Sequence, residues 1–101
     1  MKKRTIIWTP EADSDIAQIL FYLDKNWDNK VALRFLDKLD YLLFQIQTNP
    51  FQFPLFIKSY NVRKCVLSMQ NSLYYQFDES NIFILRIYDN RQNPQTIKLT
   101  F

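Results

Sequence analysis

Hydrophobic and polar residues alternate with two different periods, and the change of period divides the chain into a helical half and a strand-rich half. The apolar run at residues 5–8 predicts a short strand, and Thr9 followed by Pro10 is a typical helix start. From there apolar residues recur every three or four positions, which predicts a first amphipathic helix. Its apolar side comprises Ile16, Ile19, Leu20, Leu23 and Trp27.

A second helix is predicted after a break at residues 26–29, and it ends at Asn49 because a residue before proline avoids the helical region. Two amphipathic helices with so short a join predict an antiparallel hairpin. The chain has no glycine, so we expect asparagines at left-handed positions, one of them in the break. The candidates are Asn26, Asn49, Asn71, Asn81 and Asn90. The second apolar side comprises Ala32, Phe35, Leu36, Leu39, Leu42, Leu43 and Ile46.

The C-terminal half alternates with a period of two, as strands do. Short joins at 68–71 and 78–81 indicate hairpins. Residues 51–60 carry several aromatic side chains without a period, and we expect a packed loop there. The predicted strands are residues 62–67, 73–77 and 82–88.

These elements predict one α+β domain over residues 1–101, in the order β-α-α-β-β-β. The helical hairpin would pack on one face of a mostly antiparallel four-stranded sheet. The length suits a single domain, and 48% hydrophobic residues are enough to build its core.

Composition excludes several classes of site. There is no histidine and a single cysteine, Cys65, so we expect no metal, no cofactor and no internal disulfide. The missing glycine excludes glycine-rich phosphate loops. Cys65 lies in an apolar alternating run and is expected to be a buried strand residue, which fits a reducing cytoplasm. No apolar run approaches the roughly 18 residues that span a bilayer.

The last predicted strand carries the candidate chemistry. Alternation places Arg86 and Tyr88 together on one face, and Arg91 follows just past the strand end. The net charge of +3 permits a polyanionic partner without requiring one. A cation and a phenol side by side indicate a surface for a phosphate or a protein. The opposite face would carry Phe83, Leu85 and Ile87.

The element order and the residue pattern together resemble the RelE/ParE superfamily of toxins from bacterial type II toxin–antitoxin systems, and are closer to the ParE-like branch. The resemblance covers nearly the whole chain. Its marks are residues 7–12, 15–16, 22–23, 26–27, Ala32, 35–37, Leu39, 49–50, 62–64, 73–75, 84–86, Arg91 and Pro94.

The resemblance implies a cytoplasmic toxin that a cognate antitoxin protein neutralises. ParE-like toxins poison DNA gyrase, whereas RelE-like toxins cleave mRNA on the ribosome without a metal. The implied residues for binding the target or the antitoxin are Arg63, Lys64, Arg86, Tyr88 and Arg91. Among these, Arg63, Arg91 and Tyr88 would be catalytic only in a RelE-like toxin.

Two positions count against RelE-like activity. Cys65 and Ser72 stand where that branch has basic residues, and metal-free RNA cleavage needs cations as well as an acid and a base. We therefore expect ParE-like growth inhibition through binding of DNA gyrase. Cleavage of mRNA, and an inactive relative that only binds its antitoxin, remain the alternatives.

Purely structural roles are also open for the charged candidates. Arg86 could pair with Asp37 or Asp40 on the second helix. Asp13 and Asp15 are expected to support the start of the first helix, where negative charge is favoured.

Side chains alternate between the two faces of a strand, and this limits the roles of the remaining candidate residues. Arg63 and Lys64 are neighbours on one strand, so one of them should face solvent without a role. Tyr74 and Tyr75 lie on opposite faces of the next strand, so at least one belongs to the core.

Overall fold

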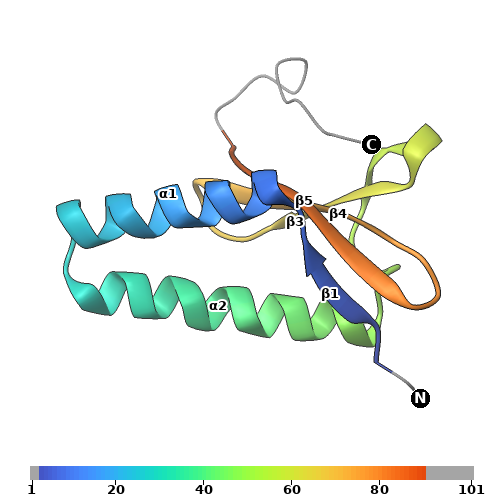
Figure 1. The fold of residues 1–101 in the computed structure, drawn as a ribbon, viewed down its shortest axis with the longest axis horizontal. Coiled ribbons are helices and arrows are strands. Elements are labelled where there is room, and N and C mark those ends of the chain that lie inside the picture. Colours follow the sequence, from blue (N-terminus) through green and yellow to red (C-terminus); the bar gives the residue numbers. More distant parts are fainter. Residues whose placement is uncertain (1–2, 91–101) are drawn as a thin grey trace.

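The computed structural model describes residues 3–90, in which two antiparallel helices pack against one face of a sheet (Figure 1). Within this part of the chain the sheet has five strands in the order β1-β5-β4-β3-β2. Strand β1 runs parallel to β5 and all other pairs are antiparallel. The elements are β1 (Thr5–Trp8), α1 (Pro10–Asn26), α2 (Asn29–Thr48), β2 (Leu55–Ile57), the 3₁₀ helix η1 (Lys58–Tyr60), β3 (Val62–Val66), β4 (Asn71–Phe77) and β5 (Asn81–Asp89).

The α+β class, the helical hairpin and the three C-terminal strands are confirmed, but the sheet has one strand more than predicted. Strand β2 lies inside the segment expected to be a loop, and Leu55 pairs with Arg63 across an irregular register. The segment is aromatic and contains Pro54, so a three-residue edge strand leaves no period to recognise.

Helix α1 begins where the sequence predicted. The Thr9 hydroxyl accepts a hydrogen bond from the Ala12 backbone N–H at 3.1 Å. The same hydroxyl donates to the carbonyl oxygens of Ile84 and Leu85, at 3.0 and 2.9 Å. Thr9 therefore caps the helix and attaches its first turn to β5.

The join between the helices differs from the prediction. Asp28 caps α2 by accepting the Lys30 N–H at 2.6 Å, with an extended backbone. Among the described residues the one positive φ falls at Asn61, after η1, so the expectation of a left-handed asparagine in the break was wrong. Trp27 is 58% exposed because α1 ends at Asn26 and Trp27 no longer follows the helical spacing.

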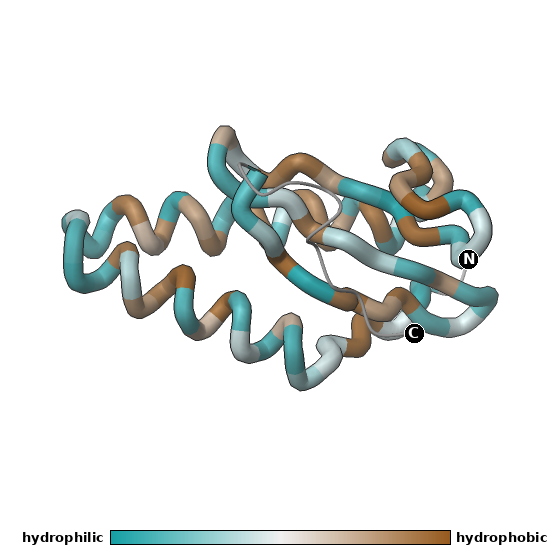
Figure 2. Tube along the Cα trace, turned by 90° about the horizontal axis from the view of Figure 1, so that it is seen from above, coloured by the Kyte–Doolittle hydropathy of each residue, from teal (hydrophilic) through white to brown (hydrophobic). Residues whose placement is uncertain are grey.

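The main core lies between the hairpin and the sheet, and Figure 2 shows hydrophobic and hydrophilic positions alternating along both helices. Tyr75 is fully buried there, and its hydroxyl donates to the Pro50 carbonyl at 2.6 Å, which joins β4 to the end of α2. No helix within residues 3–90 is long and apolar enough to cross a membrane. The buried members of this core are Ala12, Leu39, Leu42, Leu43, Ile46, Cys65, Leu67, Leu73, Tyr75, Ile82, Ile84 and Ile87.

Strand β5 contains a bulge at Leu85. Its neighbours Ile84 and Arg86 face the consecutive residues Tyr75 and Tyr74 on β4, so Leu85 has no partner in the ladder. An extra residue of this kind reverses the alternation that follows it.

The bulge changes which face Ile87 occupies. Ile87 packs in the main core, whereas Phe83 and Leu85 belong to a second cluster to which neither α-helix contributes. The prediction that these three residues share one face was therefore wrong for Ile87. The second cluster comprises Val62, Tyr74 and Leu85, with Phe56, Ile57, Phe83 and Tyr88 packed against it.

Candidate functional site

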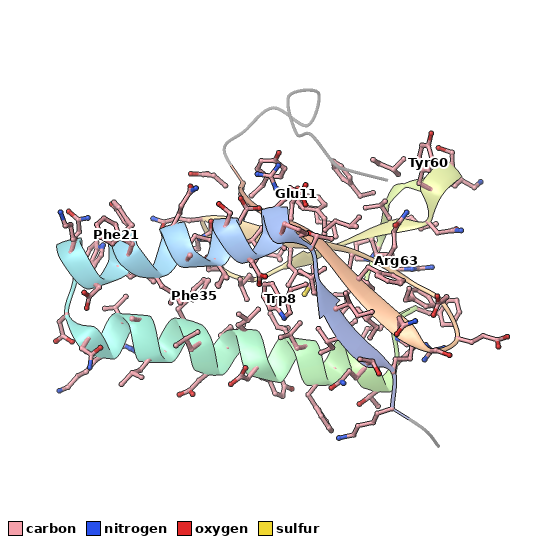
Figure 3. The ribbon with its side chains drawn as sticks, viewed as in Figure 1. Trp8, Glu11, Phe21, Phe35, Tyr60 and Arg63 are labelled. Carbon is pink, nitrogen blue, oxygen red and sulfur yellow. The ribbon has the colours of Figure 1, made fainter. Side chains whose placement is uncertain are left out.

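A cleft of about 880 Å³ opens between the two helices and the ends of β3 and β5. Figure 3 shows Phe35 between the helices, where it lines this cleft. Arg34 and Lys38 line it from α2, and Arg86 and Tyr88 line it from β5. Three cations therefore border the cleft, and its lining is in part apolar. Further apolar lining residues are Ile19, Leu23 and Leu67.

Arg86 is held at the cleft by a two-point ion pair with Asp15. Its Nε lies 2.7 Å from Asp15 Oδ2 and its Nη2 lies 2.9 Å from Asp15 Oδ1. The Arg86 side chain is 21% exposed and that of Asp15 is 11% exposed. These hydrogen bonds, which Asp15 accepts, raise the pKa of Arg86 and keep the guanidinium charged.

Asp15 reaches Arg86 because β1 is shorter than β5. Strand β1 ends at Trp8, opposite Ile84, so in the described part of the chain the following residues of β5 have no neighbouring strand on that side. The second turn of α1 lies there instead, and Asp15 Oδ2 accepts the Ile87 backbone N–H at 3.0 Å. Asp15 thus replaces a missing strand partner.

Tyr88 completes the arrangement. Arg86 Nη1 donates to the Tyr88 hydroxyl at 2.7 Å, and the guanidinium carbon lies 4.3 Å from the Tyr88 ring centroid. The Tyr88 ring contacts the Tyr74 ring, with centroids 6.2 Å apart. The cation and phenol expected together on the sheet do lie together.

The carboxylate partner of Arg86 was assigned to the wrong helix. Asp37 and Asp40 on α2 are both exposed, whereas Asp15 on α1 makes the ion pair. Helix α1 follows directly on β1 and packs beside β5, so its acidic residues are the ones within reach. Asp15 therefore does more than support the helix start.

Arg63 has a different environment. Its Nη1 donates to the carbonyl oxygens of Phe51 and Phe53, at 3.1 and 2.6 Å. The guanidinium carbon lies 5.5 Å from the Phe51 ring centroid and 5.9 Å from that of Phe77. Its Nε is buried without a hydrogen-bond partner. Arg63 therefore fixes the segment that follows α2.

The two arginines do not converge. Arg63 pairs with Tyr75 and Arg86 pairs with Tyr74, which are consecutive on β4 and so face opposite sides of the sheet. Lys64 also pairs with Tyr74 and shares the face of Arg86. Both tyrosines are buried, and burial raises the pKa of each phenol.

The positions where RelE-like toxins carry basic residues are buried in this chain. Cys65 is fully buried, as predicted, and burial raises the pKa of its thiol to about 11. Ser72 is fully buried and donates to the Asn90 side-chain oxygen. Arg91 and Pro94 lie outside the described residues. Residues 3–90 contain no group of three or more cysteine, aspartate and glutamate side chains that could hold a metal ion.

Sequence reasoning missed Arg34 and Lys38. They are four residues apart on α2 and flank Phe35, so helical spacing already places them on one side of the helix. The role of Asp15 had no such signal, because it is 71 residues away from Arg86 in the sequence.

Comparison with known proteins gives one family and several similar folds. Residues 6–94 match the model of the family described as the ParE toxin of the type II toxin–antitoxin system parDE. No curated protein matches the sequence. A chain from the chromosomal ParDE system of P. aeruginosa superposes with a TM-score of 0.70 at 20% identity, over 86% of this chain and 96% of that one. A chain of the E. coli DinJ–YafQ toxin–antitoxin complex gives 0.60 at 16% identity, over 87% and 93%.

Proposed function

Because the chain belongs to the ParE toxin family of type II toxin–antitoxin systems, we propose that it inhibits growth by binding DNA gyrase in the cytoplasm. The family match supports the ParE-like alternative over the RelE-like one. The observation that carries the proposal is the separation of Arg63 and Arg86, which lie on opposite faces of the sheet.

RNA cleavage without a metal requires cations that converge on one phosphate, together with an acid and a base. Arg63 holds two backbone carbonyls and Arg86 holds a carboxylate. From opposite faces of the sheet, the guanidinium groups of Arg63 and Arg86 do not converge on one phosphate. A toxin that acts by binding a protein needs no such convergence, so the separation of the two arginines supports a protein target. Gyrase is the protein target that the family resemblance implies.

The antitoxin is proposed to bind in the cleft. Arg34, Lys38 and Arg86 give its border a positive charge, and Phe35 is part of its apolar lining. A disordered antitoxin segment with acidic and apolar residues on alternate sides would match both properties when it folds there. The binding residues predicted from the sequence were Arg63, Lys64, Arg86, Tyr88 and Arg91, and of these Arg86 and Tyr88 line the cleft.

The gyrase proposal is tested by pulse labelling after induced expression in bacteria, following thymidine and methionine incorporation in parallel. We expect thymidine incorporation to fall first. Purified protein should also inhibit gyrase supercoiling of relaxed plasmid, and added antitoxin should reverse this. Early loss of methionine incorporation, with cleaved mRNA, would instead establish the RelE-like alternative. Continued growth with both labels incorporated would indicate an inactive relative.

A further inference from the structure

Phenyl rings and cations gather at the end of the molecule opposite the tip of the helical hairpin. Figure 3 shows Arg63 at this end and Phe21 near the other end. We call this group the basic phenylalanine cluster. It comprises Lys3, Arg4, Phe44, Phe51, Arg63 and Phe77, from the chain start, α2, β3, β4 and the segment after α2.

The contacts fall into two sets, which the consecutive residues Lys3 and Arg4 bring together. Lys3 Nζ lies 4.9 Å from the Phe44 ring centroid, and the Arg4 guanidinium carbon lies 5.4 Å from that of Phe77. The Phe77 ring meets the Phe51 ring edge-on, with centroids 4.9 Å apart. Phe51 is 63% exposed and Phe44 is 51% exposed, so both rings can be reached by a ligand.

The two N-terminal cations of the cluster, Lys3 and Arg4, differ in the groups that they contact. In the part of the chain that the structure describes, neither Lys3 nor Arg4 makes an ion pair with a carboxylate. Arg4 Nε donates to the backbone carbonyl of Asp78 at 2.8 Å. The Asp78 carboxylate accepts the backbone N–H groups of Ser80 and Asn81, and these bonds lower its pKa. A ring does not neutralise a cation above it, so Lys3 remains available to an anion. Arg4 is also attracted to the Asp78 carboxylate, whose pKa it helps to lower.

We propose that the basic phenylalanine cluster binds single-stranded nucleic acid. Exposed rings beside cations are what such a ligand requires, since bases stack on aromatic faces and cations track the phosphates. Phe51 and Phe44 supply the stacking surfaces, and Lys3 and Arg4 contact phosphates. Arg63 fixes Phe51 through the Phe51 and Phe53 carbonyls, so the ring is held in place before the ligand arrives.

This site is separate from the cleft and does not depend on gyrase. None of the six cluster residues lines the cleft. The proposal can therefore fail while the proposed function holds, and the reverse is equally possible.

The test uses fluorescence anisotropy of the full chain with labelled oligothymidylate and oligouridylate. Two phosphate contacts predict a slope of log affinity against log salt of about −1.4 from Lys3 and Arg4. The K3Q/R4Q variant should reduce the magnitude of the slope by that amount. The F51A variant should weaken binding about tenfold by removing one stacking surface. Comparison of the two probes distinguishes DNA from RNA as the ligand.

A matched control exists at the other end of the molecule. Phe21 is also 63% exposed, and Lys25 Nζ lies 5.0 Å from its ring centroid. The F21A/K25Q variant should bind as the unmodified chain does, and circular dichroism checks that all variants fold. The proposal would be overturned if F21A/K25Q weakened oligonucleotide binding as much as F51A does. It would also be overturned if K3Q/R4Q and F51A both bound the oligonucleotides as the unmodified chain does. Displacement of the probes by oligoglutamate at lower concentration would point instead to an acidic protein partner.

Discussion

Arg63 and Arg86 stand on the same sheet and have opposite surroundings. Arg63 donates to two backbone carbonyls and lies against the Phe51 and Phe77 rings. Arg86 pairs with a carboxylate and borders an open cleft. The first guanidinium organises the chain around it, whereas the second is presented, in a fixed orientation, where a partner can reach the cleft.

The difference shows that the role of an arginine on a strand depends on the groups that accept its hydrogen bonds. Backbone carbonyls that would otherwise lack donors make an arginine structural, because removing it leaves them unsatisfied. A carboxylate at a cleft orients the arginine and leaves the surrounding cations to recognise a ligand. Four experiments test this contrast, from the largest expected loss of stability to the smallest.

Replacing Arg63 should cost the most. In R63M the Phe51 and Phe53 carbonyls lose their donor and Phe51 loses its cation, and we expect a loss of about 2–3 kcal/mol in the free energy of unfolding. Urea denaturation followed by circular dichroism measures it. K64M on the same strand is the control and should cost under about 1 kcal/mol. If the two variants prove equally stable, Arg63 is not a structural residue.

The core around Arg63 should also respond to alkaline pH. Burial raises the pKa of Cys65 from 9.0 to about 11, so the folded thiol stays protonated where the unfolded thiol ionises. The contribution of Cys65 to the free energy of unfolding is complete below about pH 9 and is lost as the pH rises towards 11, by about 2–3 kcal/mol in total. Urea denaturation across this range measures it. In C65A the free energy of unfolding should fall less steeply with pH. If C65A has the same pH dependence as the unmodified chain, the alkaline loss of stability does not come from Cys65.

Removing Asp15 should loosen the Arg86 region. In D15A the guanidinium keeps Tyr88 but loses its carboxylate, and the Ile87 N–H loses its acceptor. We expect a loss of about 1–2 kcal/mol by the same denaturation assay, because the pair is only partly buried. D13A, at an exposed position two residues earlier, should cost under about 0.5 kcal/mol. Equal losses in both variants would show that the ion pair adds no stability.

Charge reversal in the cleft should leave stability nearly unchanged and act on the antitoxin. The R34E/K38E variant should weaken antitoxin binding at least about tenfold and slow association, because it places negative charge opposite an acidic segment. Surface plasmon resonance at two salt concentrations measures both. K30E lies on the same helix outside the cleft and should bind normally. Unaltered binding by R34E/K38E would exclude the cleft as the docking site.

The fold followed from the sequence because its signals are local. Thr9 before Pro10 marks the start of α1, and Asn49 before Pro50 marks the end of α2. Period-two runs gave β3, β4 and β5 within one or two residues. The short strand β2 was not predicted because three residues carry no period, and its pairing with β3 and its packing on the second cluster cannot be seen in its own sequence.

The site was harder to predict because its contacts are not local. The pairing of Asp15 with Arg86 depends on where β1 ends, and on the bulge at Leu85 that sets which way Ile87 and Arg86 point. Alternation alone cannot reveal a bulge. The structural role of Arg63 was missed because its contacts are also not local. The carbonyls that accept its hydrogen bonds belong to the segment after α2.

Asp15 has one more consequence, which concerns self-association. Among residues 3–90 no strand lies beside the outer edge of β5 beyond Ile84, and an open edge is a template on which another chain can add a strand. A single carboxylate on the second turn of α1 occupies the Ile87 N–H there and places charge on that edge. The helix therefore protects the sheet against aggregation with one side chain, and does so without adding a strand.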